Sequence, residues 1–335
     1  MIVNKTVLGE IDKCYATCLY EGKAGLVAIG CSEGPSEARA YIDGKETSIW
    51  TDVGGTMNFV HIPGRENEFY ATRRFVPLFQ AAECELNYVK YDGEKWTVKP
   101  LMKFPYLHRF DFYTKDGDIY FFGCTLCKSK EFPQDWSTCG SVYTGKLDKD
   151  PSQPFGYREL YYGITKNHGL CHCDNLNGKE CFIASGVEGA FAFYIPENPE
   201  KDEWKIEKII ETETSDVAVC DVNNDGQVEI AAIQPFHGNK CRIYKVCDGK
   251  VVQDFEYDID FGHVIWGGRI SDKNCFLLGY RRLDMRLYAI TFRNGAYFMQ
   301  MIDEKVGPSQ ISVVGNNVLA ANRQINQLAL YNIEL

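Results

Sequence analysis

The chain has 335 residues, a net charge of −10 and 13% aromatic residues. This acidic balance argues against nucleic-acid binding, which needs clustered Lys and Arg on one face. No apolar run has the length of a membrane span or of a signal-peptide core. The sequence therefore predicts a cytoplasmic protein that binds neither nucleic acid nor membrane, and it leaves the oligomeric state open.

One layout recurs along the chain: a short apolar strand, a turn rich in Asp, Asn or Gly, and a second apolar strand. In chain order the first strands begin near residues 14, 57, 108, 168, 215, 263 and 309. A propeller blade takes about 40 to 50 residues, so the spacing fits seven blades. Two more strand-like stretches follow in units such as 240–258 and 284–303, which gives four strands per unit.

The two ends of the chain complete this pattern. The last unit supplies three strands, and the N-terminal stretch 4–11 is a strand that belongs to no other unit. Because an unpaired strand edge invites aggregation, the N-terminal strand is expected to join the last blade and close the ring. The sequence thus predicts an all-β, seven-bladed β-propeller with four antiparallel strands per blade, formed as a single domain by residues 1–335.

The 14 cysteines fit a reducing compartment, where they stay as thiols and pack as small apolar side chains. Cys124, Cys127 and Cys139 have part of a zinc spacing, but the pattern lacks a fourth ligand. We interpret the cysteines as structural.

The hairpin that begins at Asp221 starts like a calcium loop. An EF-hand needs a bidentate Glu at its twelfth position, where this chain has Ala232 in a β-prone run, so the EF-hand interpretation fails. The pattern instead resembles the repeat of FG-GAP, or VCBS, propellers. That resemblance implies a seven-bladed ring and a structural Ca²⁺ or Mg²⁺ held by Asp221, Asn223, Asp225 and Glu229.

The starts of the first strands carry a second pattern. His108, His168 and His263 stand at the same place in three units, with Ser215 and Gln310 as their equivalents in two others. Radial symmetry would turn such side chains toward the axis, where imidazoles bind a divalent metal or transfer protons. We predict an axial site for Mn, Zn or Mg formed by His108, His168, His263 and Gln310, with His172 further along the same strand face as a catalytic residue.

The loops between second and third strands should reach the same mouth of the ring. They contribute His237 and Tyr280, predicted to be catalytic, and a set predicted to bind substrate, in which Arg offers a planar fork for carboxylates or sugar hydroxyls. The substrate set comprises Arg73, Arg74, Glu188, Arg281, Arg282 and Arg323.

Histidines on the axis surrounded by arginines describe a polar funnel for a small carbohydrate. A base and a group that stabilises an enolate suit a lyase, dehydratase or isomerase that removes a proton next to a carbonyl of a keto-sugar or sugar acid. The repeat type is similar to the propeller part of aldos-2-ulose dehydratase, and the axial set is similar in kind to that of the oligogalacturonate lyases. The alternative is a non-catalytic propeller that binds a protein or glycan partner.

Overall fold

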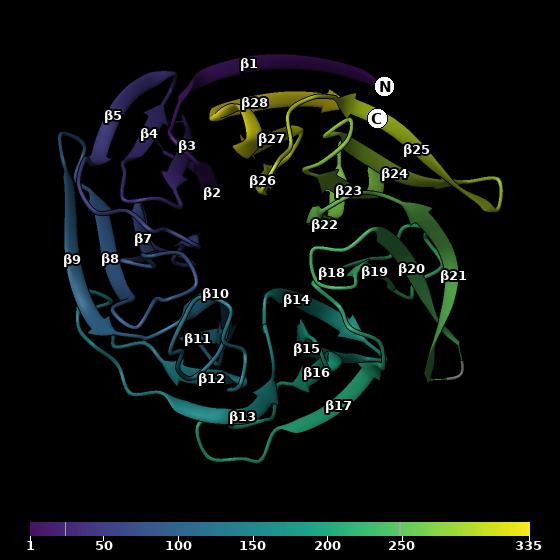
Figure 1. Cartoon of the computed structure of the whole chain (residues 1–335), viewed down its shortest axis with the longest axis horizontal. Helices are drawn as coiled ribbons and strands as arrows, with labels where there is room; N and C mark the ends of the chain where they lie inside the picture. Colours follow the sequence, from purple (N-terminus) through teal and green to yellow (C-terminus); the bar gives the residue numbers. More distant parts are fainter. Residues whose placement is uncertain (24, 248) are drawn as a thin grey trace.

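The computed structural model describes residues 1–23, 25–247 and 249–335. Seven four-stranded antiparallel sheets are arranged as blades around a central axis (Figure 1). The seven-bladed propeller and its four strands per blade are therefore confirmed. Within the described ranges, no helix has the length and apolar character needed to span a membrane.

Each blade starts with the strand nearest the axis and proceeds outward, as the colours and labels of Figure 1 show. Blades 1 to 3 consist of β2(Cys14–Gly22), β3(Gly25–Ser32), β4(Ala38–Ile42) and β5(Lys45–Trp50); β6(Phe59–His61), β7(Glu68–Arg73), β8(Glu85–Tyr91) and β9(Trp96–Lys103); and β10(Leu107–Lys115), β11(Asp118–Thr125), β12(Gly140–Lys146) and β13(Arg158–Ile164).

Blades 4 to 6 follow the same order. They consist of β14(Gly169–Leu176), β15(Lys179–Gly186), β16(Gly189–Tyr194) and β17(Lys205–Ile210); β18(Asp216–Cys220), β19(Glu229–Gln234), β20(Lys240–Cys247) and β21(Lys250–Asp258); and β22(Gly262–Ile270), β23(Lys273–Tyr280), β24(Leu287–Arg293) and β25(Ala296–Asp303).

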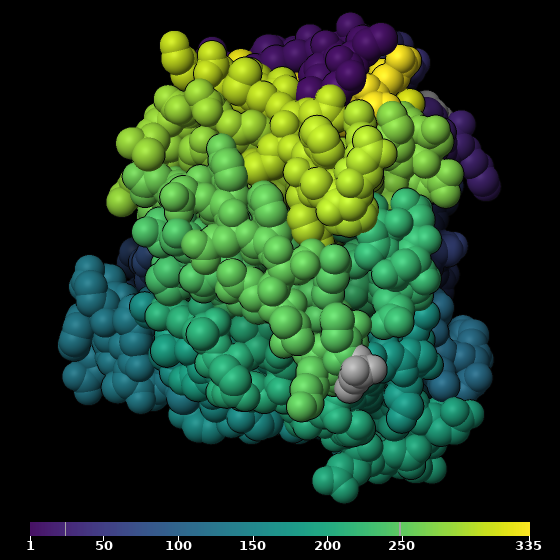
Figure 2. Space-filling view, turned by 90° about the vertical axis from the view of Figure 1, so that its right-hand side faces the viewer, coloured from purple at the N-terminus to yellow at the C-terminus, as the bar shows by residue number. Residues whose placement is uncertain are grey.

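Blade 7 combines both ends of the chain, as the sequence predicts. It contains β26(Gln310–Val314), β27(Asn317–Asn322), the short 3₁₀ helix η1(Arg323–Ile325) and β28(Gln327–Glu334), with β1(Ile2–Glu10) as its outermost strand. β1 pairs antiparallel with β28, from Ile2 opposite Glu334 to Glu10 opposite Gln327. Figure 2 shows the purple N-terminal segment lying against the yellow C-terminal strands at the edge of the molecule.

The position of a strand within its blade explains its residue pattern. The second strand β19 is buried at all six positions, because neighbouring blades cover both of its faces. The outermost strand β21 instead has six exposed and three half-buried residues and no buried one. Between blades, aromatic rings fill the core; Phe122 and Phe182, both fully buried, stack with their ring centroids 4.2 Å apart.

The Asp221 hairpin joins β18 to β19 and is held together by hydrogen bonds from its backbone amides to its own carboxylates. Asp221 accepts hydrogen bonds from the amides of Asp225 and Gly226, and Glu229 accepts one from the Val222 amide. No three acidic, His or Cys ligand atoms of this hairpin converge within the described part of the chain. These oxygens therefore stabilise a turn, and the structure offers no support for a calcium site here.

Candidate functional site

Four histidines converge at the end of the axis where the inner strands begin, which we call the top. His108, His168, His237 and His263 line a cavity of about 440 Å³ with Tyr15 and Arg281, and we call this space the histidine cavity. Phe79, Trp136, Phe236 and Phe261 form much of its wall. Four of the six histidines of the chain thus share one cavity.

The inner strands place these side chains by two routes. In β2, β10 and β22 the pairing register shifts by one residue near the start of the strand, and the extra residues are Tyr15, His108 and His263. An extra residue of this kind bends the strand and redirects its side chain. His168 instead precedes the first residue of β14, and its amide bonds to the carbonyl of Ser185.

His237 reaches the cavity from the loop between β19 and β20. Its φ of 45° lies in the left-handed region, where His is among the more tolerated residues. The following residue must be small, because a Cβ on Gly238 would lie 2.3 Å from the carbonyl carbon of Gln234. The loop is therefore folded back tightly, and the imidazole lies between Phe236 and His263, with ring centroids 4.1 and 4.9 Å away.

Two of the imidazoles are oriented by the next blade of the ring. His168 Nδ1 donates a hydrogen bond of 3.2 Å to the carbonyl of Ser215, and His263 Nδ1 donates one of 2.7 Å to the carbonyl of Ser309. Because Nδ1 carries the proton in both rings, each Nε2 keeps its lone pair. Such backbone partners fix the tautomer of metal-ligating histidines in the same way.

The geometry of His168, His237 and His263 fits a divalent metal. One nitrogen from each lies within 4.8 Å of the others, and the Nε2 atoms of His168 and His237 are 3.5 Å apart. Two ligands of a tetrahedral zinc lie about 3.4 Å apart, given Zn–N bonds of about 2.0–2.1 Å.

The protonation states of the three imidazoles also suit a metal. Burial lowers the pKa of His168 and of His263 well below the usual range, and neighbouring histidines and arginines add to the effect. Burial, followed by Arg281, lowers the pKa of His237 to about 3. All three rings are therefore neutral near pH 7, as metal ligands must be.

His108 lies beside this group and outside it. Its ring centroid is 4.5 Å from that of His168, and its Nδ1 is buried without a hydrogen-bond partner among the described residues. Burial lowers its pKa well below the usual value, and Arg109 lowers it further. His108 is therefore a neutral imidazole with one nitrogen uncommitted.

Gln310 occupies a different position from the one the sequence predicts. Ser309 is the register equivalent of Ser215, because the amides of both bond to the second strand of their blade, at Ala321 and Ile233. Gln310 therefore stands one residue further along, below the histidine cavity. Its side chain accepts a bond from the Thr17 amide and donates one to the Met57 carbonyl, so both of its polar atoms are used within the fold.

His172 and Tyr280, the other predicted catalytic residues, do not line the histidine cavity. His172 stacks on Phe182 and bonds through Nε2 to Glu180, 2.8 Å away. With Asp174, these two form a second, more exposed group of possible ligands. Tyr280 is buried and stacks on Tyr288.

The structure divides the predicted substrate set. Arg281 and Arg323 line the histidine cavity, and Arg282 lies over the Phe261 ring at its edge. The remaining three make local contacts elsewhere: Arg73 bonds to Val53 and Asp52, Arg74 pairs with Glu85, and Glu188 accepts bonds from Thr165. These contacts join loops within and between neighbouring blades.

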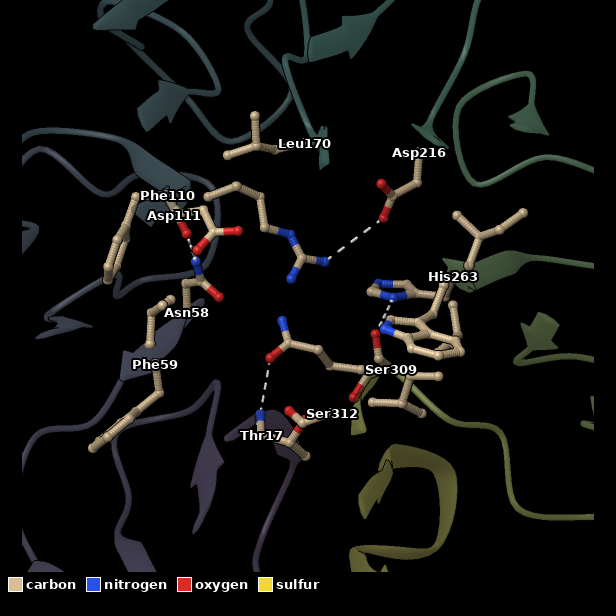
Figure 3. A pocket seen from close by; sticks show the side chains of 17 residues that line it. Thr17, Asn58, Phe59, Phe110, Asp111, Leu170, Asp216, His263, Ser309 and Ser312 are labelled. Atoms are coloured by element: carbon tan, nitrogen blue, oxygen red, sulfur yellow. Dashed lines mark hydrogen bonds and ion pairs between the residues drawn. The ribbon is translucent and has the colours of Figure 1, made fainter. Parts of the chain in front are cut away.

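Sequence reasoning missed two groups of residues near the axis. Tyr15 stands one residue into the first unit, in the same register as His108 and His263, and this register was the available signal. Arg109, Asp111 and Asp216 line a second cavity of about 250 Å³ in the channel below the histidines, which we call the channel cavity (Figure 3). These three residues follow no periodic pattern in the sequence. A charged residue on an inner strand can also be a capping group, so its presence alone does not indicate a site.

Comparison with known proteins supports the fold. No protein-family model and no curated protein matches the sequence. Among solved structures, a protein from Bacteroides uniformis provisionally named a 6-phosphogluconolactonase is 14% identical, with a TM-score of 0.59, and the match covers 96% of this chain and 91% of that one. The β-propeller domain of Cps50 (Swd1) from Myceliophteria thermophila is 9% identical, with a TM-score of 0.62 and coverage of 99% and 100%.

A second provisional 6-phosphogluconolactonase, from Bacteroides fragilis, is 14% identical with a TM-score of 0.54, covering 92% of this chain and 86% of that one. Identities at this level establish a shared fold and leave the chemistry to be argued from the site. The FG-GAP resemblance gains no support from these comparisons beyond the seven-bladed ring.

Proposed function

We propose that the histidine cavity is the active site of a metal-dependent enzyme that acts on a small anionic sugar derivative. The observation that carries the proposal is the convergence of three neutral imidazoles, two of which are oriented by the carbonyls of the next blade. In this proposal His237 replaces His108 and Gln310 in the metal set. A bound divalent metal would polarise a carbonyl or carboxylate oxygen of the substrate.

Two cations of the cavity suit the anionic group of such a substrate. Arg323 is paired with Glu33 at 2.5 Å, whereas Arg281 and Lys166 have no carboxylate partner within the described ranges. Lys166 lies over the Phe236 ring, and Arg281 over the Phe261 ring. These two side chains can therefore hold a carboxylate or phosphate without first breaking an ion pair.

His108 and Tyr15 provide the proton transfers that an elimination requires. In this scheme His108, whose neutral imidazole lines the cavity, accepts the proton next to the substrate carboxylate, the C–O bond on the adjacent carbon breaks, and a C=C bond forms. Burial raises the pKa of Tyr15 to about 12, so its phenol keeps a proton that it can give to the departing oxygen. In this proposal His108 is the base and Tyr15 the acid of a sugar lyase or dehydratase.

Hydrolysis of a sugar lactone is the second candidate. Two of the similar propellers carry that provisional name, and the same cations would accept a phosphorylated sugar lactone. An elimination creates a C=C bond that absorbs in the ultraviolet, whereas lactone opening releases acid without one. Assays of both signals on panels of uronates and sugar lactones distinguish the two reactions.

Metal content tests the proposal directly. Mass spectrometry of the purified protein should find about one equivalent of a transition metal, lost in the double variant His168→Ala, His263→Ala. His61→Ala is the matched control, since His61 stacks on Tyr20 at the end of the inner strand β6 and does not line the histidine cavity. Equal metal content in the double variant and the wild type would refute the metal centre and favour the non-catalytic binding platform.

A further inference from the structure

The channel cavity contains a buried cation without a bonded partner. No hydrogen bond joins the Arg109 guanidinium to any group in the described part of the chain, and its closest carboxylate oxygen, Asp216 Oδ2, is 3.9 Å away. The Arg109 side chain is nonetheless only 12% exposed. Because burying a charge whose N–H groups lack hydrogen-bond acceptors is costly, the space around this guanidinium is expected to hold groups that bond to it.

Two carboxylates face the same space. Asp111 lies two residues along β10 from Arg109 and therefore on the same strand face. Figure 3 shows Asp111 and Asp216 projecting toward the axis, with the Asp216 ion pair drawn as a dashed line. In both residues Oδ1 accepts a bond from the amide of the following residue, so Oδ2 is left for the channel.

Several of the other polar side chains of the wall are bonded within the fold. The Asn58 side chain donates to the Phe110 carbonyl, the Gln310 side chain is bonded at both ends, and the hydroxyls of Thr17 and Ser312 bond to each other. The charged side chains of the channel cavity, which keep unused hydrogen-bonding capacity, are Arg109, Asp111 and Asp216. Its volume of about 250 Å³ greatly exceeds the ~30 Å³ that one water occupies in the liquid.

The charge arrangement selects the class of ligand. A free anion would meet two carboxylates, and a metal cation would meet the guanidinium. A neutral ligand needs groups that accept from Arg109 and donate to Asp216 across a short distance, and two hydroxyls on adjacent carbons do both. We propose that the channel cavity is a binding subsite for the vicinal hydroxyls of a sugar, recognised by Arg109 and Asp216 with Asp111 alongside.

The subsite lies next to the histidine cavity, since His263 lines both. The proposal deepens the proposed function, because it places a hydroxylated part of the substrate below the reacting carbon. It also makes a separate statement, namely that neutral polyols bind in the absence of any metal.

The test uses the full chain after treatment with a chelator, with myo-inositol as probe and cyclohexanol as its matched control. Both have a six-membered ring, and only inositol has vicinal hydroxyls. Titration calorimetry and saturation-transfer NMR should show millimolar binding of inositol and no binding of cyclohexanol. Asp216→Asn and Arg109→Met should each weaken inositol binding at least tenfold, whereas Arg293→Met, at an exposed arginine of β24, should leave it unchanged.

Thermal unfolding midpoints show whether each variant is folded. If Arg109→Met does not fold, the binding measured with Asp216→Asn decides the test. Equal binding of inositol and cyclohexanol, unchanged inositol binding in a folded Asp216→Asn variant, or preferential binding of the zwitterion serine would each overturn the subsite. Absence of a transition metal from the purified, untreated wild type would refute the metal centre and leave this result standing, so the two proposals fail separately.

Discussion

His237 Nε2 lies 3.5 Å from His168 Nε2, although the two residues belong to different blades and different kinds of segment. His168 precedes an inner strand of blade 4, and His237 lies in a loop of blade 5. A shared metal would tie these segments together, so it should stabilise the ring as well as serve chemistry.

This predicts that metal raises the thermal stability of the protein through His237. Zn²⁺ at about 100 times its dissociation constant should stabilise the wild type by about 2.7 kcal/mol, because it binds only the folded state. His237→Phe, which keeps an aromatic ring next to Phe236, should lose most of this effect, and His61→Ala should retain it. Differential scanning calorimetry with and without Zn²⁺ measures the difference; an equal shift in His237→Phe would exclude His237 as a ligand.

A second prediction concerns pH and Glu229, which is only 2% exposed. Burial raises the pKa of Glu229 to about 7, and Asp225 and Asp221 contribute. The folded state then binds more protons than the unfolded state between about pH 4.5 and pH 7, so the free energy of unfolding should fall as pH rises through this window.

The expected loss from Glu229 is about 1 to 2 kcal/mol. It is smaller than the whole pKa shift would give at about 1.4 kcal/mol per unit, because the hairpin lies near water. Urea unfolding across this window measures it, and Glu229→Gln should flatten the dependence. Asp174→Asn, at an exposed carboxylate of the neighbouring hairpin, is the control. A slope that persists unchanged in Glu229→Gln would assign it to other groups.

The third prediction concerns the junction of blades 3 and 4. Phe182 is fully buried and stacks on Phe122. Phe182→Ala should reduce the free energy of unfolding by about 3 to 5 kcal/mol, as expected for a large cavity in a packed core. Phe298→Ala, at an outer-strand residue that is 47% exposed, should cost far less. Similar unfolding midpoints in urea for the two variants would contradict this account of blade packing.

The fourth prediction concerns ring closure. Removal of residues 1–10 would leave β28 as an unpaired edge and would delete the Lys5–Asp303 ion pair to blade 6. We expect concentration-dependent aggregation and a lower melting temperature, because an open strand edge pairs with other chains. Light scattering during heating measures both. A truncated protein that melts as the wild type does would show that β1 contributes little to closure.

The sequence predicted the ring and part of the site for different reasons. Strand periodicity and turn residues recur in every blade, so seven units could be counted, and the N-terminal strand was correctly assigned to the last blade. The strand register was harder to predict to within one residue. A single extra residue at the start of β10 and β22 directs His108 and His263 to the axis, whereas Gln310 lies one position below its supposed equivalents.

Pairing between distant charges was also beyond the sequence. Arg281 and Arg73 are both arginines at the end of the second strand of a blade, yet Arg281 lines the histidine cavity and Arg73 bonds to Val53 and Asp52. Arg109 lies in blade 3 and Asp216 in blade 5, and they approach each other only because the ring curves. Such contacts depend on three-dimensional closure, which local patterns do not encode.

The extra residues Tyr15, His108 and His263 separate the packing of the blades from the choice of side chains at the axis, two requirements that usually compete. Each is the second residue of its strand, and the residues after it keep regular pairing, so the residue facing the axis can change while the packing between blades does not. A propeller built in this way can acquire a new reaction by point substitutions at a few strand starts. Its stability and its chemistry are then free to evolve at different rates.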